Sequence, residues 1–260
     1  MNKYDLKDKV VIITGAGGAI GSAMAHAFAK NGAKVAVADL ADTRETVAQE
    51  IIAQGGEAMA VQVDVSDKAS TMAMCDAVMA KWGRIDVLVN NAGINGGPDQ
   101  RKPIHEYDDN LWHKIMKVDL DGVYYCSKAA IPHIAKQGGT IINIGSIVGQ
   151  TPLRLQCAFA AAKAAVLHLT KAMALELAPL DITVNAIAPG SILFEGTKAL
   201  FYADPEKAKA MTSHIPQGHP GEADDVCGLA MFLASKDAKY MTGTVNTVDG
   251  GWICGYARDF

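Results

Sequence analysis

Short runs of apolar, often β-branched residues alternate with helical patterns along most of this chain. The runs expected to form strands are residues 9–15, 33–39, 57–65, 85–93, 139–146, 182–190 and 243–251. The patterns expected to form helices cover about 19–31, 42–54, the stretch from the third strand to 81, 108–136 and about 157–179. Continuous apolar strands separated by helices are typical of a parallel sheet that is covered on both faces. The sequence therefore predicts an α/β fold with a single doubly wound parallel sheet.

The chain of 260 residues is long enough for one such domain, and we expect residues 1–260 to form it. No Pro/Gly/Ser-rich linker, low-complexity tract or internal repeat divides the sequence. Residues 191–220 interrupt the alternation and contain Pro205, Pro216 and Pro220. We interpret them as a loop-and-helix insertion beside a binding site rather than as a second domain.

Composition and charge exclude several classes of function. The formal net charge of −4 and the absence of a basic block argue against nucleic-acid binding. We expect no signal peptide and no membrane span, because we find no apolar run of the roughly 20 residues that a span needs. The five cysteines show no C-x-x-C pairing and indicate reduced thiols in a cytoplasmic protein. The histidines lack ligand spacing, so we expect no catalytic metal.

A glycine-rich turn, "TGAGGAIG" (14–21), stands between the first strand and the first helix. Glycines allow a tight turn and a close approach to a pyrophosphate, and the helix N-terminus offers free N–H groups to it. Asp39 ends the second strand, where a carboxylate can bind both ribose hydroxyls of adenosine and repel a 2′-phosphate. Arg44 follows only five positions later, so the pattern favours NAD over NADP. The alternative is that Asp39 caps a helix.

Over nearly its whole length the sequence resembles the short-chain dehydrogenase/reductase family. The turn is similar to the family's T-G-x-x-x-G-x-G motif, with Ala19 at the place of the second glycine. Four further motifs follow in the family's order: "DV" (64–65), "NNAG" (90–93), "GSIVG" (145–149) and "PG" (189–190). Between the last two, "FAAAK" (159–163) occupies the place of the family's Y-x-x-x-K motif.

The resemblance implies a Rossmann-type fold and hydride transfer between an alcohol or carbonyl carbon and NAD. The catalytic positions would be Ser146, Phe159, Lys163 and Asp119. In the family, a tyrosine passes a proton to or from the substrate oxygen, the lysine lowers the pKa of that tyrosine, and the serine hydrogen-bonds the same oxygen. The implied cofactor-binding residues are Gly15, Gly18, Ala19, Ile20, Gly21, Asp39, Leu40, Asp64, Val65, Asn91, Ala92, Gly93, Lys163, Pro189, Gly190 and Ile192.

Three residues depart from the family pattern. Asp119 stands where an asparagine usually anchors a water, and Phe194 stands where a threonine often touches the carboxamide, which Ile192 can still meet through its backbone. Phe159 has no hydroxyl and so lacks the proton donor. Either a tyrosine was replaced deliberately to hold a complex unreacted, or the chain is a naturally non-catalytic, NAD-binding regulatory protein. The retained Lys163 favours the first interpretation.

The substrate is expected to be a small molecule, namely a polyol, a sugar or a sugar acid. Residues 94–103 and 191–216 should border it, with Ser146, Asn95 and Arg154 as candidate contacts; Arg154 is alternatively a surface charge. The C-terminal "GWICGYARDF" (251–260), with Arg258, is expected to approach another subunit's site, as in some relatives. By resemblance to the family, we expect a homotetramer.

Overall fold

The computed structural model describes residues 4–97, 100–198 and 202–255. Its centre is a seven-stranded sheet in the order β3-β2-β1-β4-β5-β6-β7, and every neighbouring pair is parallel. The strands are β1 Val10–Thr14, β2 Lys34–Asp39, β3 Glu57–Gln62, β4 Val87–Asn90, β5 Gly139–Ile144, β6 Ile182–Pro189 and β7 Val245–Val248. Each lies within one of the seven predicted runs, so the predicted doubly wound α/β fold is confirmed.

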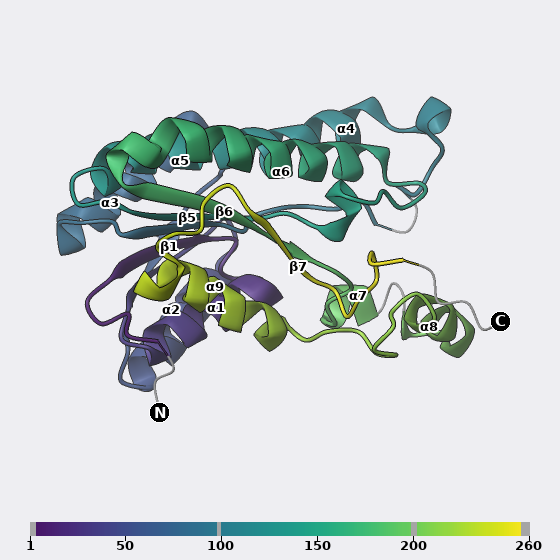
Figure 1. Cartoon of the computed structure of the whole chain (residues 1–260), viewed down its shortest axis with the longest axis horizontal. Coiled ribbons are helices and arrows are strands. Elements are labelled where there is room, and N and C mark those ends of the chain that lie inside the picture. The colour runs from purple at the N-terminus through teal and green to yellow at the C-terminus, as the bar shows by residue number, and fades with distance from the viewer. Residues whose placement is uncertain (1–3, 98–99, 199–201, 256–260) are drawn as a thin grey trace.

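Helices cover both faces of this sheet (Figure 1). Helices α1, α2 and α9 pack on one face, and α3, α5 and α6 on the other. Their bounds are α1 Ala19–Lys30, α2 Thr43–Ala53, α3 Lys68–Trp82, α4 Asp109–Met116, α5 Gly122–Ile134, α6 Cys157–Leu177, α7 Glu195–Thr197, α8 Pro205–Thr212 and α9 Ala223–Ala234. The short α7 and α8 lie in residues 191–220, the segment that the sequence analysis set apart.

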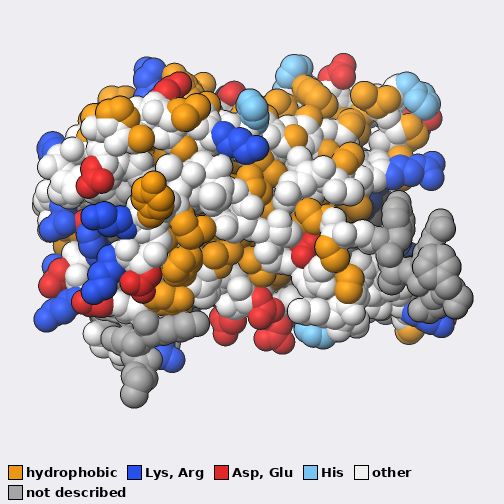
Figure 2. Space-filling model, viewed as in Figure 1, with side chains coloured by type: hydrophobic (Ala, Val, Ile, Leu, Met, Phe, Trp, Pro, Cys, Tyr) orange, Lys and Arg blue, Asp and Glu red, His pale blue; other side chains and the backbone are white. Residues whose placement is uncertain are grey.

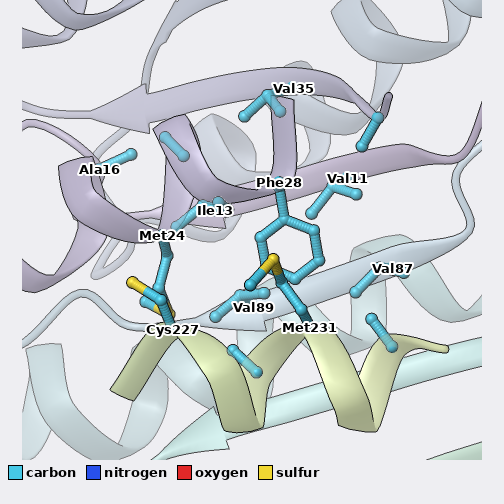
Figure 3. Packing of buried hydrophobic residues seen from close by; sticks show 14 of the residues in the cluster. Val11, Ile13, Ala16, Met24, Phe28, Val35, Val87, Val89, Cys227 and Met231 are labelled. Carbon is cyan, nitrogen blue, oxygen red and sulfur yellow. The ribbon is translucent and has the colours of Figure 1, made fainter. Parts of the chain in front are cut away.

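One half of the core lies between α1, the sheet and α9 (Figure 3). Met24 and Phe28 of α1 are fully buried beside Val89 of β4, with Cys227 and Met231 of α9 closing the layer. Burying a side chain of this size contributes about 1.5–3 kcal/mol. The cysteine here acts as a small hydrophobic residue, because burial raises the pKa of the Cys227 thiol to about 12.

The predicted helix 108–136 is interrupted. Between α4 and α5 the chain makes a π-helical turn over Lys117–Asp121, which widens the spiral by one residue per turn. The turn contains Asp119, whose side chain is fully buried. Turns of this kind are frequent at functional sites.

Helix α6 bears on the expectation that the chain has no membrane span. Within the described residues, Cys157–Leu180 is long and apolar enough to cross a membrane by length and composition, which the sequence analysis had not expected. In the structure, however, α6 packs against the sheet and buries Lys163 and Thr170 together with its apolar face. These contacts are typical of a core helix.

The face of the molecule in Figure 2 carries charges of both signs, with Lys and Arg interleaved with Asp and Glu. Hydrophobic side chains are exposed among them across the middle of this view. The arrangement on this face gives no continuous basic surface of the kind that binds a phosphate backbone.

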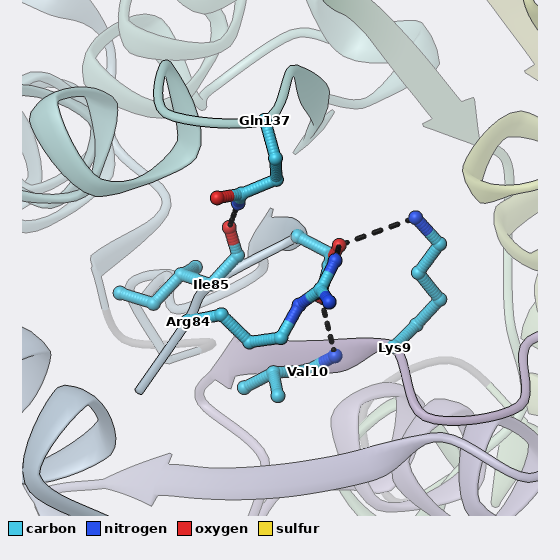
Figure 4. A network of polar contacts seen from close by, with 6 residues as sticks. Lys9, Val10, Arg84, Ile85 and Gln137 are labelled. Atoms are coloured by element: carbon cyan, nitrogen blue, oxygen red, sulfur yellow. Dashed lines mark hydrogen bonds and ion pairs between the residues drawn. The ribbon is translucent and has the colours of Figure 1, made fainter. Parts of the chain in front are cut away.

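A buried carboxylate ties the start of β1 to the start of β4 (Figure 4). Asp86 accepts hydrogen bonds from Val10 N (3.0 Å) and from Arg84 Nε (2.8 Å), and it pairs with Lys9 Nζ (3.2 Å). Burial raises the pKa of the Asp86 carboxyl, but the bonds from Arg84 and Val10 and the charge of Lys9 outweigh it, so the pKa lies below its ordinary value.

We predict that Asp86→Asn lowers the free energy of unfolding by about 1.5–3 kcal/mol at neutral pH, the scale of hydrogen bonds to a charged group. Because the pKa is depressed in the folded state, this stabilisation is present above the unfolded value of about 3.9 and is lost as the pH falls through the folded value. Urea unfolding at several pH values should therefore show the two proteins converging in acid. A difference that stays constant with pH would contradict the assignment, and Asp76→Asn, on the exposed face of α3, is the control.

Candidate active site

The carboxyl ends of β1 and β4 are neighbours at the point where the strand order reverses. In doubly wound sheets this switch point opens a crevice in which ligands bind. Two neighbouring cavities that share lining residues lie there. The first, here called the glycine arm, has a volume of about 540 Å³ and is lined by Gly15, Gly18, Asp39 and Asp64. The second, the serine arm, has a volume of about 560 Å³ and is lined by Ser146, Phe159 and Lys163. Asn91 and Gly93 line both arms.

The glycine-rich turn is held by hydrogen bonds to Asn91, the residue that follows β4. The amide of Asn91 donates to the carbonyl oxygens of Thr14 (2.9 Å) and Gly15 (3.1 Å), while Asn91 N donates to Thr14 Oγ1 (3.0 Å). Gly15 has a φ of 65°, which favours glycine. At Gly21 a Cβ atom would lie 2.2 Å from the carbonyl oxygen of Gly15, so only glycine lets the helix approach this closely.

The N-terminus of α1 opens onto this arm. Gly18 is its N-cap, no side chain caps the helix, and no acidic residue stands in its first turn. Ala19, Ile20 and Gly21 line the cavity at this end. Free N–H groups and the positive end of the helix dipole suit a phosphate group. The residues present therefore fit the pyrophosphate of a dinucleotide.

Asp39 is held in place by the backbone around it. Its Oδ2 accepts from Gly17 N (2.8 Å) and its Oδ1 from Ala41 N (2.9 Å), which leaves the carboxylate on the wall of the glycine arm. The N-cap of α2 is Asp42, so Asp39 is not the cap of that helix. Arg44 does not line this arm and donates instead to Leu40 O and Asp42 Oδ1.

The serine arm combines a hydroxyl, a ring and a buried ammonium. Ser146 follows β5, and its Oγ accepts from Val148 N at 3.2 Å. Lys163 of α6 is only 5% exposed, and its Nζ donates to Ile144 O at 3.3 Å and lies 5.6 Å from the centre of the Phe159 ring. The ring supplies no hydroxyl to this group of side chains. Gly149 lies in the short 3-10 turn Ile147–Gly149 after β5 and lets this turn approach α6, because a Cβ there would lie 2.7 Å from the backbone of Lys163.

The carboxylate of Asp119 pairs with Lys163. The π-helical turn places Asp119 Oδ2 3.1 Å from Lys163 Nζ, and Oδ1 accepts from Ile94 N at 2.8 Å. Both side chains are buried, at 0% and 6% exposure. A Cβ at Gly93 would come within 2.9 Å of Asp119 Oδ2, so the glycine makes room for this ion pair.

The structure brings all but one of the candidate residues together. The glycine arm is lined by Gly15, Gly18, Ala19, Ile20, Gly21, Asp39, Leu40, Asp64, Val65, Asn91, Ala92 and Gly93. The serine arm is lined by Asn95, Asp119, Ser146, Phe159, Lys163, Pro189, Gly190 and Ile192, among others. Arg154 is the exception, since it is exposed and its loop reaches the cavity only through Leu153 and Gln156.

Sequence reasoning missed other residues of the serine arm. Arg101 follows β4 in the loop that the sequence analysis assigned to the substrate, but it was not singled out. Thr197, Met211 and Trp252 also line the cavity, from segments distant in sequence, and no local motif marks them. Arg258 lies outside the described residues. Among those described, no group of three histidine, cysteine or acidic side chains is placed to hold a metal ion.

Comparison with known proteins agrees with this geometry. The family described as "Enoyl-(Acyl carrier protein) reductase" matches residues 15–253. The chain is 42% identical over 253 residues to 3beta-hydroxysteroid dehydrogenase 1 of Eggerthella lenta, covering 95% of this chain and 94% of that protein. It is 34% identical over 256 residues to 2-dehydro-3-deoxy-D-gluconate 5-dehydrogenase of Dickeya dadantii, covering 97% and 98% of the two chains.

A crystal structure from Beutenbergia cavernae is similar throughout. That protein is assigned as an NAD(P)-dependent gluconate 5-dehydrogenase and was crystallised with NADP bound at low occupancy; the TM-score is 0.90 at 38% identity, covering 96% of this chain and 99% of that one. The fold and the site define a dinucleotide-binding oxidoreductase. The chain belongs to the short-chain dehydrogenase/reductase family.

Proposed function

We propose that this chain has the fold and site of an NAD-dependent dehydrogenase that interconverts a secondary alcohol and a ketone, and that Phe159 impairs its catalysis. The substrate class we propose is a polyol, a sugar or a sugar acid. The observation that supports the proposal is that Ser146, Phe159 and Lys163 line one cavity, which shares lining residues with an arm suited to a dinucleotide. Turnover measured before and after Phe159→Tyr tests it.

The residues that would hold NAD lie along both arms. The N-terminus of α1 would bind the pyrophosphate, Asp39 the adenosine ribose, and Lys163 the nicotinamide ribose, with Pro189, Gly190 and Ile192 beside the nicotinamide. When bound, NAD exchanges a hydride with the alcohol carbon.

The chain's own residues would then bind the substrate without completing the proton transfer. The Ser146 hydroxyl donates a hydrogen bond to the reacting oxygen and so orients the alcohol. Phe159 fills the volume of a tyrosine but neither gives nor takes a proton. The expected result is a bound complex with negligible turnover, because charge would be stranded on the substrate oxygen.

A second candidate function is an NAD-binding regulatory protein that never turns over. The ion pair between Asp119 and Lys163 favours it, because a buried ammonium that already has a carboxylate partner does not need a tyrosine hydroxyl beside it. Phe159→Tyr distinguishes the two candidates, because it should raise turnover in the dehydrogenase and leave the regulatory protein without turnover.

The position of Asp39 leads to a prediction about cofactor choice. NAD should bind at least tenfold more tightly than NADP, a difference of about 1.4 kcal/mol, because the carboxylate repels a 2′-phosphate. Asp39→Ala should reduce the difference between the NAD and NADP affinities. Calorimetric titration with both cofactors measures it, and equal affinities in the unaltered chain would contradict the assignment.

A matched control for this titration is Asp42→Ala. Asp42 lies three positions away, its side chain is 93% exposed, and it does not line the glycine arm. Its removal should leave the ratio of NAD to NADP affinity unchanged. A change as large as that of Asp39→Ala would show that general surface charge sets the preference.

We further propose that residues 94–103 and 191–216 border the substrate, that the protein is cytoplasmic and that it forms a homotetramer. The exposed apolar side chains of Tyr124 on α5 and Leu175 on α6, at 46% and 81% exposure, support an association surface on these helices. Sedimentation of the purified protein would measure the oligomeric state.

A further inference from the structure

We infer that Gln156, together with Asn95, binds a second hydroxyl of the substrate beside the reacting one, so that the serine arm selects vicinal diols over alcohols with a single hydroxyl. The inference rests on the proposed function and deepens it, because it names the group by which a polyol, a sugar or a sugar acid would be recognised. Three features support it: the burial of Gln156, the hydrogen bonds that the two amides leave unmade, and the place of Gln156 beside Phe159.

Gln156 is a buried amide with unused hydrogen-bonding capacity. The residue is only 5% exposed and lines the serine arm. Its side chain makes one hydrogen bond to the described residues, in which Asn95 Nδ2 donates to Gln156 Oε1 at 3.4 Å. This distance is longer than the usual range of about 2.7–3.2 Å. Gln156 Nε2 donates to no described residue, and because a buried polar group without a partner is costly, we expect it to bind a polar group of a ligand.

The amide nitrogen of Gln156 is open to the cavity. Among the described residues, several fully enclosed side-chain atoms lack a hydrogen bond, and Gln156 Nε2 is not one of them. Asn95 lines the same cavity, and its Oδ1 accepts no hydrogen bond from a described residue. The two amides therefore offer a donor and an acceptor. A hydroxyl group can use both, because it accepts and donates at the same oxygen.

The backbone before α6 holds Gln156 in this position. Leu155 has a φ of 67°, in the left-handed region that residues other than glycine rarely occupy. Gln156 is the N-cap of α6, and its carbonyl oxygen accepts from Ala160 N, but its side chain makes no capping hydrogen bond. The amide is therefore left for Asn95 and the cavity. Strained backbone of this kind is frequent at ligand-binding sites.

Gln156 lies close to the place of the reaction. It stands three positions before Phe159, so the two residues are neighbours on one side of α6. Both line the serine arm together with Ser146. A substrate whose reacting oxygen meets Ser146 can therefore bring the hydroxyl of its neighbouring carbon to the amide of Gln156. A hydroxyl on a distant carbon would not reach it in the same pose.

Matched alcohols that differ in one hydroxyl test the inference. Cyclohexanol, cis- and trans-1,2-cyclohexanediol and 1,4-cyclohexanediol are titrated into the unaltered Phe159 chain with NAD present, and binding is followed by ligand-observed NMR, which detects weak affinities. At least one 1,2-diol should bind roughly tenfold more tightly than cyclohexanol, the scale of one or two neutral hydrogen bonds. The 1,4-diol should bind like cyclohexanol.

Three variants sharpen the test. Gln156→Leu keeps a side chain of similar size without the amide, and it should lower 1,2-diol affinity roughly tenfold while leaving cyclohexanol binding as it was. Asn95→Leu should reduce the same preference. The control is Gln150→Leu, which removes an exposed amide that bonds Thr247 Oγ1 at 3.1 Å and does not line the serine arm, and it should change none of these affinities.

The inference is overturned if no 1,2-diol binds more tightly than both cyclohexanol and the 1,4-diol, or if Gln156→Leu keeps the preference. A Gln156→Leu chain that melts at a lower temperature and keeps the preference would show that the two amides only tie the chain together.

The NAD affinity of each variant separates this inference from the proposed function. Gln156→Leu should bind NAD like the unaltered chain, which also shows that the variant is folded. NAD binding without any preference for 1,2-diols refutes the role of Gln156 and Asn95 alone. A chain that does not bind NAD refutes the proposed function, and the inference with it.

Discussion

Phe159→Tyr is expected to raise NAD-dependent turnover by at least about 10²-fold, and by up to about 10⁴-fold, the usual contribution of general acid–base catalysis. The new hydroxyl would lie beside Lys163, whose Nζ is 5.6 Å from the centre of the present ring. A neighbouring ammonium lowers the pKa of a tyrosine from about 10, so oxidation should speed up as the pH rises through the lowered value. The effect should fall on kcat more than on binding, because only one oxygen is added.

Steady-state NADH absorbance with a panel of polyols and sugar acids, from about pH 6 to 10, measures this gain. The matched control is Phe194→Tyr, which adds a hydroxyl to the wall of the same cavity from another segment and should stay inactive. Lys163→Ala in the tyrosine background should remove most of the gain. If the Phe159→Tyr protein is as inert as the original on every compound, the non-catalytic regulatory function is the better account.

Lys163→Met is expected to lower the free energy of unfolding by about 3–5 kcal/mol, because it leaves a buried carboxylate without its partner. Asp119 is 0% exposed, and its Oδ2 lies 3.1 Å from Lys163 Nζ and has no other hydrogen-bond partner among the described residues. Urea unfolding measures the loss. The double variant Asp119→Asn with Lys163→Met should recover most of it, since no charge then remains buried and the new amide oxygen can still accept from Ile94 N.

If Lys163→Met lowers the free energy of unfolding by less than about 1 kcal/mol, the range of exposed ion pairs, this account of the ion pair is contradicted. A double variant no more stable than Lys163→Met would do so as well, because the loss would then come from packing of the lysine chain rather than from its charge. The outcome bears on function, since an ion pair that stabilises the fold gives a reason for Lys163 to be kept without a tyrosine.

Local patterns predicted the strands well because each strand is a continuous apolar run. The ends were less accurate: the run 57–65 stops pairing at Gln62. Asp64 forms a turn there, since its carboxylate accepts hydrogen bonds from Ser66 N and Oγ. In an apolar stretch, the sequence pattern of such a turn is hard to distinguish from that of a strand. The glycine turn was predictable because its chemistry lies within eight consecutive residues.

The parts that could not be predicted depend on contacts between distant segments. Within the π-helical turn at Lys117–Asp121, Asp119 forms an ion pair with Lys163 and accepts a hydrogen bond from Ile94 N. Both partners are far from Asp119 in sequence. Which arginine lines the cavity depends on the fold in the same way. Arg154 lies between Ser146 and Phe159 in sequence, but its side chain is exposed, while Arg101 reaches the cavity from the loop after β4.

The central claim is that this chain binds NAD and an alcohol in one cleft and lacks only the proton donor. A single-turnover experiment tests it most directly, with enzyme in excess over NAD, saturating alcohol, and NADH absorbance followed by stopped flow for the Phe159 and Phe159→Tyr forms side by side. We expect equal NAD affinity in the two forms, rapid NADH formation in the tyrosine form and almost none in the original. Equal rates of NADH formation in the two forms, whether both fast or both absent, would contradict it.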